Sequence, residues 1–345
     1  MKKTYSVNKD LIPGIAIPLV CALVIPLVFI AVGSDNPQKT LKIFFTEPWS
    51  NAWFLGNTID SIALLLASAL GALVAFRGGC FNLGCEGQIY LGGCAAAIVL
   101  LHKINLPGGL MLLLAALAAA AAGGLMGGVS GLLRKRLNAN ELITSFLFAA
   151  ALIPLGDYLI SAVLRSPEMN LLAADKFSSD RVLPKLLLPS SLSVSIIIIF
   201  SLVFLVQFFI RRTASGYRFR ISGAAPDLAL FAGIDPNKRF TPAMTVSGAL
   251  AGLAGFFAVA GTYGMCYQGF SGGLGWNGIA LALIAGNEPL LLIPAALIFG
   301  SIKAGAAAVM LHSGFGFETA AFIEAAVLLL AALPFGVRYL RGRSL

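Results

Sequence analysis

The stretch RRTASGYRFRISGAAPDLALFAGIDPNKRF, residues 211–240, separates two long apolar runs and contains the densest group of basic residues in the chain. Within it, Ala225 and Pro226 can start a helix, because proline in the first turn loses no intrahelical hydrogen bond. Asp227 suits the positive end of the helix dipole, and Gly233 provides a stop. The apolar face would consist of Leu228, Leu230, Phe231 and Ile234. The pattern predicts a short amphipathic helix that docks a soluble partner, with an ordinary cytoplasmic loop as the alternative.

The composition excludes a soluble globular protein. Mean hydropathy is +0.90 and charged residues make up only 11% of the chain, against about a quarter in soluble domains. Apolar runs long enough to cross a bilayer recur from end to end, which predicts a polytopic, all-α transmembrane bundle. The net charge of +9 does not indicate nucleic-acid binding, because the basic residues flank apolar runs and form no continuous face.

The apolar runs predict about ten spans in one transmembrane domain, 1–345. Lys2, Lys3 and Lys9 precede the first span, and basic residues also follow the last, so we expect both termini in the cytoplasm. The expected spans are residues 11–32, 58–76, a re-entering segment that ends near 101, 106–133, 141–164, 190–210, 241–263, 276–285, 290–311 and 318–335.

Ionisable residues inside spans need a reason, because each costs about 2.5–3.5 kcal/mol at the bilayer centre. Lys303 and Glu324 fall at similar depths on two consecutive antiparallel spans, and we predict that they form a buried ion pair. The pair would fix the helical hairpin or, alternatively, contact a substrate. Asp157 and Asp60 lie in the outer halves of their spans and could accept hydrogen bonds from substrate hydroxyls, although solvation at a helix end is the simpler interpretation.

Two irregular segments interrupt the apolar pattern. In FNLGCEGQ, residues 81–88, Asn82 can cap a helix whose first turn contains Glu86. Irregular backbone at membrane depth occurs only inside protein or beside a water-filled cavity, so this segment is a candidate gate. The second segment, residues 264–278, is rich in glycine and aromatic side chains that could stack on a sugar or base. An interfacial aromatic belt is the alternative. The candidates for the translocation path are Asn82, Glu86, Gln88, Asp157, Tyr267, Trp276 and Asn277.

Cysteine and histidine usage argues against metal or disulfide chemistry. The five cysteines lie mostly in apolar runs, and the two histidines fall at expected helix ends. We therefore expect the cysteines to be packing residues, with no metal site and no cofactor. No phosphate-binding loop is present, so the chain itself should not hydrolyse ATP.

Several motifs together resemble one family. FNLGCEGQIYLGG at 81–93, LNANELITS at 137–145, SGAAPDLALFAGI at 222–234, SGALAGLAGFFAV at 247–259 and GWNGIALALIAGNEPLLLIPAALIFG at 275–300 occur in the expected order. They are similar to permease subunits of ABC importers in the branched-chain amino acid and simple-sugar superfamily, especially its nucleoside branch. The resemblance implies a coupling helix at 225–234 within the loop 211–240. The residues that would couple it to an ATPase are Asp227, Ala229, Phe231, Gly233 and Ile234.

The resemblance also implies a function and a set of partners. The chain would be the permease subunit of an ATP-driven importer in the bacterial cytoplasmic membrane, with nucleosides, purine nucleosides foremost, as its cargo. Its partners would be a cytoplasmic ATPase, a second identical or paralogous permease subunit and a substrate-binding lipoprotein. A permease for a simple sugar such as ribose is the alternative within the family. An ion-coupled secondary transporter and a purely structural membrane subunit are alternatives outside it.

Overall fold

The computed structural model describes residues 24, 26–312, 322 and 325 of the chain. Within these residues the regular elements are all helical, and only isolated β-bridges occur. The predicted all-α architecture is thereby confirmed for the described part. In chain order the helices are α2 (Pro37–Thr46), η1 (Glu47–Trp49), α3 (Ala52–Arg77), α4 (Cys85–Leu101), α5 (Gly108–Leu137), α6 (Glu141–Tyr158), η2 (Leu159–Val163), η3 (Ser179–Arg181), α7 (Ser195–Arg212), α8 (Ala214–Ala224), α9 (Pro226–Phe231), α10 (Asn237–Phe256), η4 (Phe257–Tyr263), α11 (Leu274–Ile284), η5 (Pro289–Leu291) and α12 (Leu292–His312).

Six helical segments are long and apolar enough to cross a membrane: Ala52–Arg77, Gly108–Leu137, Glu141–Val163, Ser195–Arg212, Asn237–Tyr263 and Pro289–His312. Two shorter apolar helices, α4 and α11, coincide with the expected re-entering segment and the expected span at 276–285. The expected spans at 11–32 and 318–335 fall largely outside the described residues. The chain is thus a multi-pass membrane protein, while ten spans and the placement of the termini remain predictions.

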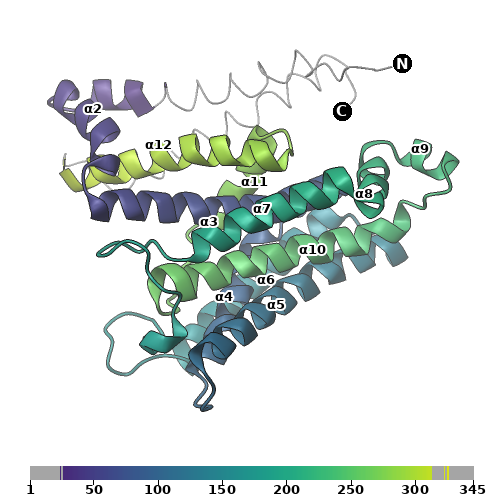
Figure 1. The fold of residues 1–345 in the computed structure, drawn as a ribbon, viewed down its shortest axis with the longest axis horizontal. Helices are drawn as coiled ribbons and strands as arrows, with labels where there is room; N and C mark the ends of the chain where they lie inside the picture. Colours follow the sequence, from purple (N-terminus) through teal and green to yellow (C-terminus); the bar gives the residue numbers. More distant parts are fainter. Residues whose placement is uncertain (1–23, 25, 313–321, 323–324, 326–345) are drawn as a thin grey trace.

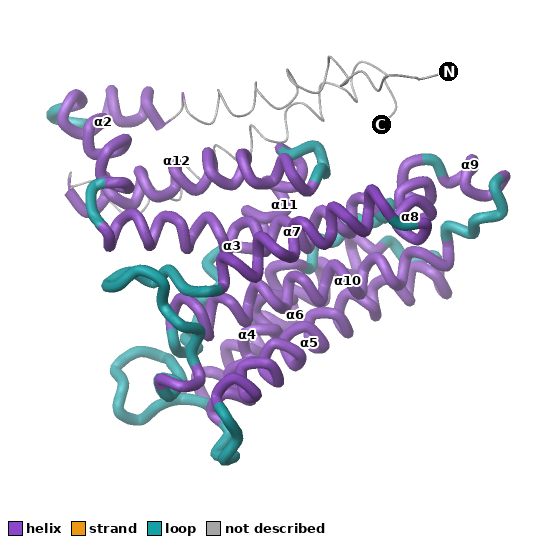
Figure 2. Tube along the Cα trace, viewed as in Figure 1, coloured by secondary structure: helices purple, strands orange, loops and turns teal. Residues whose placement is uncertain are grey.

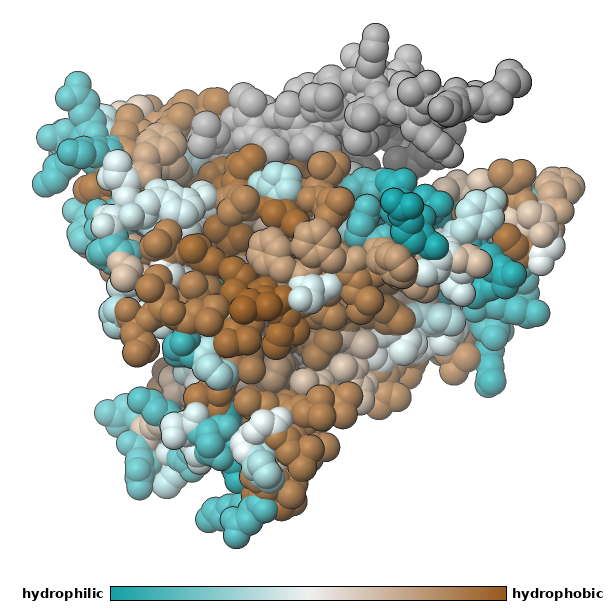
Figure 3. All heavy atoms as spheres, in the orientation of Figure 1, coloured by the Kyte–Doolittle hydropathy of each residue, from teal (hydrophilic) through white to brown (hydrophobic). Residues whose placement is uncertain are grey.

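The long helices run side by side between two ends of different character (Figure 1). One end carries α8 and the projecting α9, and we call it the α9 end. The other end carries the long connection 164–194, drawn as an extended loop in Figure 2, and we call it the loop end. On the face shown in Figure 3, apolar residues cover the middle of the molecule and hydrophilic residues gather at both ends. This distribution matches a bundle whose middle lies in lipid.

The centre of the bundle consists of α3, α4 and α10. In the most apolar stretch of α3, 83% of the residues are buried, and the corresponding value for Asn237–Tyr263 is 78%. By contrast, only 28% are buried in α5 and α7 and 17% in Glu141–Val163. The outer helices therefore offer most of the apolar surface to lipid or to other subunits.

Small residues allow the central helices to approach closely. A Cβ atom on Gly92 of α4 would lie 2.5 Å from the Cα atom of Gly252 of α10, and one on Gly123 of α5 would overlap the carbonyl oxygen of Gly248. Side chains larger than hydrogen would therefore separate these helices. This packing is typical of membrane helices, which associate through small residues rather than through a hydrophobic effect.

The helix that contains α10 breaks before the chain crosses back. After the π-helical turn η4, residues 264–273 are irregular, and Gly264, Gly269, Gly272 and Gly273 all have positive φ. We call residues 264–273 the re-entrant segment. It leads into α11, whose 11 residues span about 16 Å, roughly half of the apolar core of a bilayer. The expected span at 276–285 is therefore a half-helix that begins inside the protein.

The connection at the loop end holds the re-entrant segment from outside. The Ala174 N–H donates to the carbonyl of Cys266 at 2.8 Å, and the Phe177 N–H donates to that of Gly264 at 2.9 Å. The Gln268 N–H in turn donates to Leu172 O at 2.9 Å. Residues 172–177 therefore act as a backbone clamp over the segment rather than as a free loop.

Candidate functional site

Glu86, in the first turn of α4, holds the start of the half-helix α11. Its Oε1 accepts hydrogen bonds from the Ser271 hydroxyl at 2.6 Å and from the Gly273 N–H at 3.1 Å, and its Oε2 accepts from the Gly275 N–H at 2.6 Å. The N–H groups at a helix start have no intrahelical acceptor, and the helix dipole favours negative charge there. Glu86 is only 6% exposed, so its carboxylate replaces water as the cap of α11.

Tyr90, one helical turn beyond Glu86, fixes the middle of the re-entrant segment. Its ring stacks on Phe270 with centroids 4.9 Å apart. Its hydroxyl accepts from the Gly269 N–H at 2.9 Å and donates to a carboxylate oxygen of Asp157 on α6. Asp157 is half-buried and accepts this hydrogen bond, so it orients the Tyr90 ring.

Asn82 and Gln88 form a third group of internal hydrogen bonds, which joins the start of α4 to α10. The Asn82 amide donates to Gln88 Oε1 and to the Ser247 hydroxyl on α10, both at 2.8 Å, while Gln88 Nε2 donates to Asn82 Oδ1 at 3.1 Å. The N-cap of α4 is Gly84, which makes no side-chain cap hydrogen bond. The expectation that Asn82 is the N-cap is therefore wrong: its Oδ1 accepts from the N–H of Gly84 at 3.0 Å, before the first turn, and its amide nitrogen joins this segment to α10.

These contacts divide the candidate path residues into anchors and surface groups. Asn82, Glu86 and Gln88 are buried and engaged in internal hydrogen bonds. Asn277 is also buried, and Tyr267 is half-buried within the re-entrant segment, where it pairs with Ala173 in a β-bridge.

Trp276 is the exception among the candidates. It lies in the first turn of α11 and is 38% exposed. Its ring centroid lies 6.2 Å from that of Phe146 on α6, which is 43% exposed. The two rings form a small aromatic surface on the open side of the half-helix, next to the residues that anchor it. The sequence predicts Trp276 as a candidate for the path but not Phe146, because no sequence pattern connects α6 with α11.

The predicted short helix at the α9 end exists as α9, and its end is closed by local hydrogen bonds. The Ile234 N–H donates to Ala229 O at 2.8 Å, and the Gly233 N–H donates to Leu230 O at 2.9 Å. Gly233 has φ of 74°, the left-handed conformation that such helix ends need and that glycine adopts without strain. Ile234 itself is half-buried.

The outward face of α9 is apolar. Phe231 is 91% exposed, Leu230 58% and Leu228 57%, whereas Ala229 is fully buried. Ala229 therefore supports the helix from beneath and does not belong to its outer face, although we expected it where a partner approaches. Asp227 is exposed in the first turn. Three large apolar side chains on one six-residue projection are typical of a surface that a partner covers.

The α9 end is linked to the half-helix by an ionic cluster. Glu288, four residues after α11, forms salt bridges with Arg77 at the end of α3 and with Arg211 at the end of α7, the latter at 2.6 Å. Arg77 Nε also donates to the carbonyl of Asn287 at 2.6 Å. Glu288 therefore joins the C-terminal end of α11 to α7, the helix that leads into α8 and α9.

Asp60 belongs to a buried polar cluster at the loop end. It is only 1% exposed, so helix-end solvation is not its role. Its Oδ2 accepts from the hydroxyls of Thr262, at 2.8 Å, and Ser191, at 3.0 Å. Lys185 donates to the carbonyls of Gly261 and Ser191, at 2.5 and 2.8 Å, and burial lowers the pKa of Lys185. The cluster ties the long connection to α3 and to the end of η4.

The remaining candidates are placed only in part. Lys303 lies within α12 and is half-buried, but Glu324 lies outside the described residues, so their ion pair stays a prediction. The described cysteines, Cys80, Cys85, Cys94 and Cys266, are buried and free of disulfides.

The fold and these sites define a polytopic membrane protein with a half-helix that begins inside the bundle and a short projecting helix, α9. Residues 54–333 match the model of the family described as branched-chain amino acid transport system / permease component. The chain belongs to this family of transport permeases.

Three relatives sharpen this assignment. The chain is 36% identical to the "Probable riboflavin import permease protein RfuC" of Treponema pallidum, over 86% of this chain and 79% of the relative. It is 30% identical to the guanosine ABC transporter permease protein NupP of Bacillus subtilis, over 84% of each. It is 27% identical to the nucleoside ABC transporter permease protein NupB of Lactococcus lactis, over 95% of this chain and 92% of the relative. No solved structure matches the chain.

Proposed function

We propose that the chain is the membrane permease subunit of an ATP-driven importer, and that α9 is its coupling helix. The observation that carries this proposal is the outward face of α9, where Leu228, Leu230 and Phe231 are exposed beyond the lipid-facing bundle. A separate cytoplasmic ATPase would cover these side chains and supply the work of transport. In this assignment the whole chain, 1–345, forms one permease domain with the α9 end in the cytoplasm of a bacterial cell.

For the cargo, we propose a compound with a planar nitrogen-containing ring and a polyhydroxylated chain or sugar. Riboflavin and guanosine, the compounds named for two of the relatives, share this chemistry. The exposed rings of Trp276 and Phe146 suit such a cargo, because aromatic faces stack on planar rings at centroid separations of about 4.5–7 Å. Purine nucleosides fit this class, and riboflavin extends it.

The mechanism we propose is alternating access driven from the α9 end. Nucleotide-dependent movement of the ATPase would shift α9 and α8. The salt bridges from Arg77 and Arg211 to Glu288 would pass that shift to the C-terminal end of α11. The N-terminal end of α11, held by Glu86, would keep Trp276 at the path while the C-terminal end of α11 moves. A second permease subunit would complete the path, and a binding lipoprotein would deliver the cargo.

Uptake of radiolabelled riboflavin, guanosine and ribose, measured in the native host with and without the gene for this chain, tests the assignment. We expect riboflavin or guanosine uptake to require the chain, to stop when cellular ATP is depleted and to survive a protonophore that leaves ATP intact. Ribose-only uptake would overturn the proposed cargo. Collapse with the protonophore at constant ATP would overturn the ATP-driven importer in favour of an ion-coupled carrier.

Replacement of Trp276 tests the aromatic surface. Trp276→Ala removes the exposed ring and should raise the half-saturating concentration of the transported ring compound about tenfold, in line with about 1–3 kcal/mol for stacking on a base. Trp276→Phe keeps a flat face and serves as the matched control, with a change of less than about threefold. Equal effects of both variants would contradict a stacking role.

A further inference from the structure

A polar pocket lies at the α9 end, away from the aromatic surface of Trp276. It has a volume of about 380 Å³. Its walls come from the end of α3, one face of α8 and the turn after α11. The lining residues are Phe76, Arg77, Tyr217, Arg220, Ile221, Gly223, Ala224, Gly286 and Asn287.

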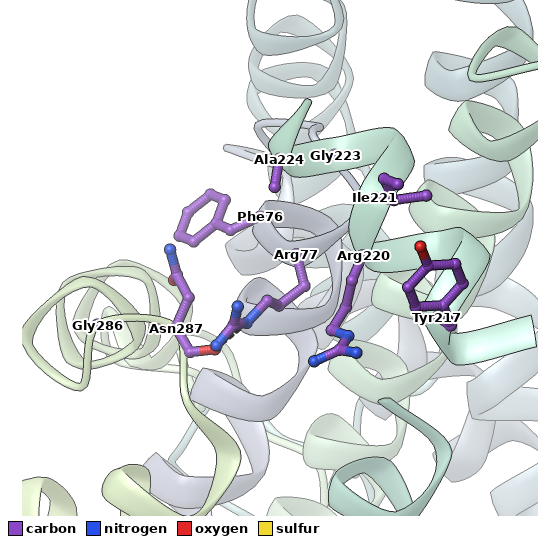
Figure 4. A pocket seen from close by; sticks show the side chains of 9 residues that line it. All are labelled: Phe76, Arg77, Tyr217, Arg220, Ile221, Gly223, Ala224, Gly286 and Asn287. Carbon is purple, nitrogen blue, oxygen red and sulfur yellow. Dashed lines mark hydrogen bonds between the residues drawn. The ribbon is translucent and has the colours of Figure 1, made fainter. Parts of the chain in front are cut away.

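The pocket carries an excess of positive charge. Figure 4 shows the side chains of Arg77 and Arg220 lying beside one another, with Asn287 on the far side of Arg77 and Tyr217 on the far side of Arg220. Glu288 pairs with Arg77 and with Arg211, so one carboxylate already serves two guanidinium groups. No ion pair or hydrogen bond to Arg220 occurs within the part of the chain that the structure describes. Arg220 is therefore available to an anion that enters the pocket.

Two polar atoms of the pocket are buried without partners among the described residues: Nε of Arg220, a donor, and Oδ1 of Asn287, an acceptor. Buried polar groups are paired in nearly all native structures, so these two atoms are available to a ligand that enters the pocket. A ligand that satisfies both must present an anionic oxygen to Arg220 and a donor, such as a hydroxyl or an amine, to Asn287. A phosphate that carries a small alcohol has both.

The neighbouring helix shows where such a phosphate would come from. On α7, Phe204, Leu205 and Phe208 are all more than half exposed, and the helix ends at Arg211 and Arg212. Apolar exposure followed directly by arginine marks the change from acyl chains to headgroups. Helix α8 begins two residues later and brings Tyr217 and Arg220 to the pocket. The opening therefore lies at the depth of lipid phosphates.

We propose that this pocket binds the headgroup of an anionic phospholipid, with its phosphodiester on Arg220 and a headgroup hydroxyl donating to Asn287 Oδ1. Phe76, Tyr217 and Ile221 would contact the glycerol and the first acyl carbons. Because α8 leads directly into α9, a bound lipid would brace the coupling helix against the end of α3. Free phosphate shares the anion but lacks the glycerol and the acyl chains.

Native mass spectrometry of the purified chain tests the site, with phosphatidylglycerol and phosphatidylcholine titrated in separate series. We expect phosphatidylglycerol to bind about tenfold more tightly than phosphatidylcholine, and Arg220→Gln to weaken phosphatidylglycerol binding about tenfold, as the loss of one charge-assisted hydrogen bond would. Arg218→Gln removes the same charge from the same helix outside the pocket, and it should change the affinity by less than about twofold. Equal losses in both variants would overturn the site in favour of diffuse surface charge.

Two further arms separate the other ligands. Inorganic phosphate that displaces phosphatidylglycerol at millimolar concentration would overturn the lipid assignment in favour of a soluble anion. Lack of any preference for phosphatidylglycerol would overturn it too, in favour of an acidic side chain of a protein partner. If Arg220→Gln does not fold, Asn287→Gly removes the orphan acceptor. Asn287 already has φ of 58°, so glycine keeps the turn, and the proposal requires a weaker preference for phosphatidylglycerol in that variant as well.

Discussion

Helix α9, the proposed coupling helix, and the half-helix α11 are both short, yet they are held in opposite ways. Helix α9 is closed by its own backbone, and only Ala229 on it is fully buried. Helix α11 is held by side chains from other helices, above all Glu86, which accepts three hydrogen bonds from residues 271–275. The free apolar face of α9 suits a partner, whereas the N–H groups at a helix start inside the membrane need an acceptor from the protein, which for α11 is Glu86.

The comparison predicts that changes around α11 lower the free energy of unfolding, while changes on α9 leave it intact and affect only coupling. Glu86→Ala should have the largest effect. It leaves the Ser271 hydroxyl and the N–H groups of Gly273 and Gly275 without an acceptor, and each orphan costs about 1–3 kcal/mol. Chemical unfolding of the purified chain in detergent micelles should show a loss of at least about 3 kcal/mol.

Glu86→Gln is the graded control. The amide keeps one accepting oxygen, but its NH₂ group faces an N–H group that donates to the carboxylate in the wild type. We therefore expect the free energy of unfolding to fall by about 1–3 kcal/mol. Indistinguishable stabilities for the wild type and Glu86→Ala would mean that water or another group caps α11, and the contrast with α9 would fail.

The next effect comes from crowding the same junction. Gly275 lies so close to Glu86 that a Cβ atom would overlap the Glu86 backbone. Gly275→Ala should therefore cost about 1–3 kcal/mol, the usual range for overpacking. Gly109→Ala is the matched control because a Cβ there meets nothing within 4 Å, and alanine favours the helix. Equal stability of the two variants, read from the same unfolding curves, would contradict the close approach of α11 to α4.

A smaller effect is expected at Tyr90, where only the hydroxyl is removed. Tyr90→Phe keeps the stacking on Phe270 but loses the hydrogen bonds to Asp157 and Gly269. The expected cost is about 1–2 kcal/mol in the same assay. Tyr158, 61% exposed on α6, provides the control, and Tyr158→Phe should lie within about 0.5 kcal/mol of the wild type. A cost at Tyr158 equal to that at Tyr90 would remove the distinction between anchor and surface.

The same contrast explains what could be predicted from the sequence. Helix α9 was predicted because its signals are local: proline at its start, apolar residues at helical spacing and Gly233 at its end. The long apolar helices were predicted for the same reason. The irregular segments at 81–88 and 264–278 were also recognised, because glycine and polar residues interrupt the apolar pattern.

The partners of those segments could not be predicted. Glu86 lies 189 residues from Gly275, and Asn82 lies 165 from Ser247, and no local pattern carries such pairings. The sequence therefore predicts Asn82 as a helix cap and all three of Asn82, Glu86 and Gln88 as candidates for the path, whereas the hydrogen bonds of Asn82 to α10 and of Glu86 to the start of α11 appear only in the folded chain. The role of Glu288, which joins the ends of α3 and α7, likewise depends on packing that only the folded chain shows.

Phe231 tests the central claim most directly, because it is 91% exposed and contributes little to the fold. Gly233 is a poorer target, since its positive φ would add strain to any larger residue. The decisive measurement is guanosine and riboflavin uptake by cells that carry Phe231→Asp. Phe204→Asn, on the apolar face of α7, serves as a surface control, and the membrane level and unfolding midpoint of each variant are measured in parallel.

We predict that Phe231→Asp reaches the membrane at the wild-type level, unfolds within about 0.5 kcal/mol of it and loses at least about 90% of ATP-dependent uptake, since a charge on the apolar face blocks docking. Wild-type uptake by a stable Phe231→Asp chain would contradict the account, because α9 would then not be the element through which a partner drives transport.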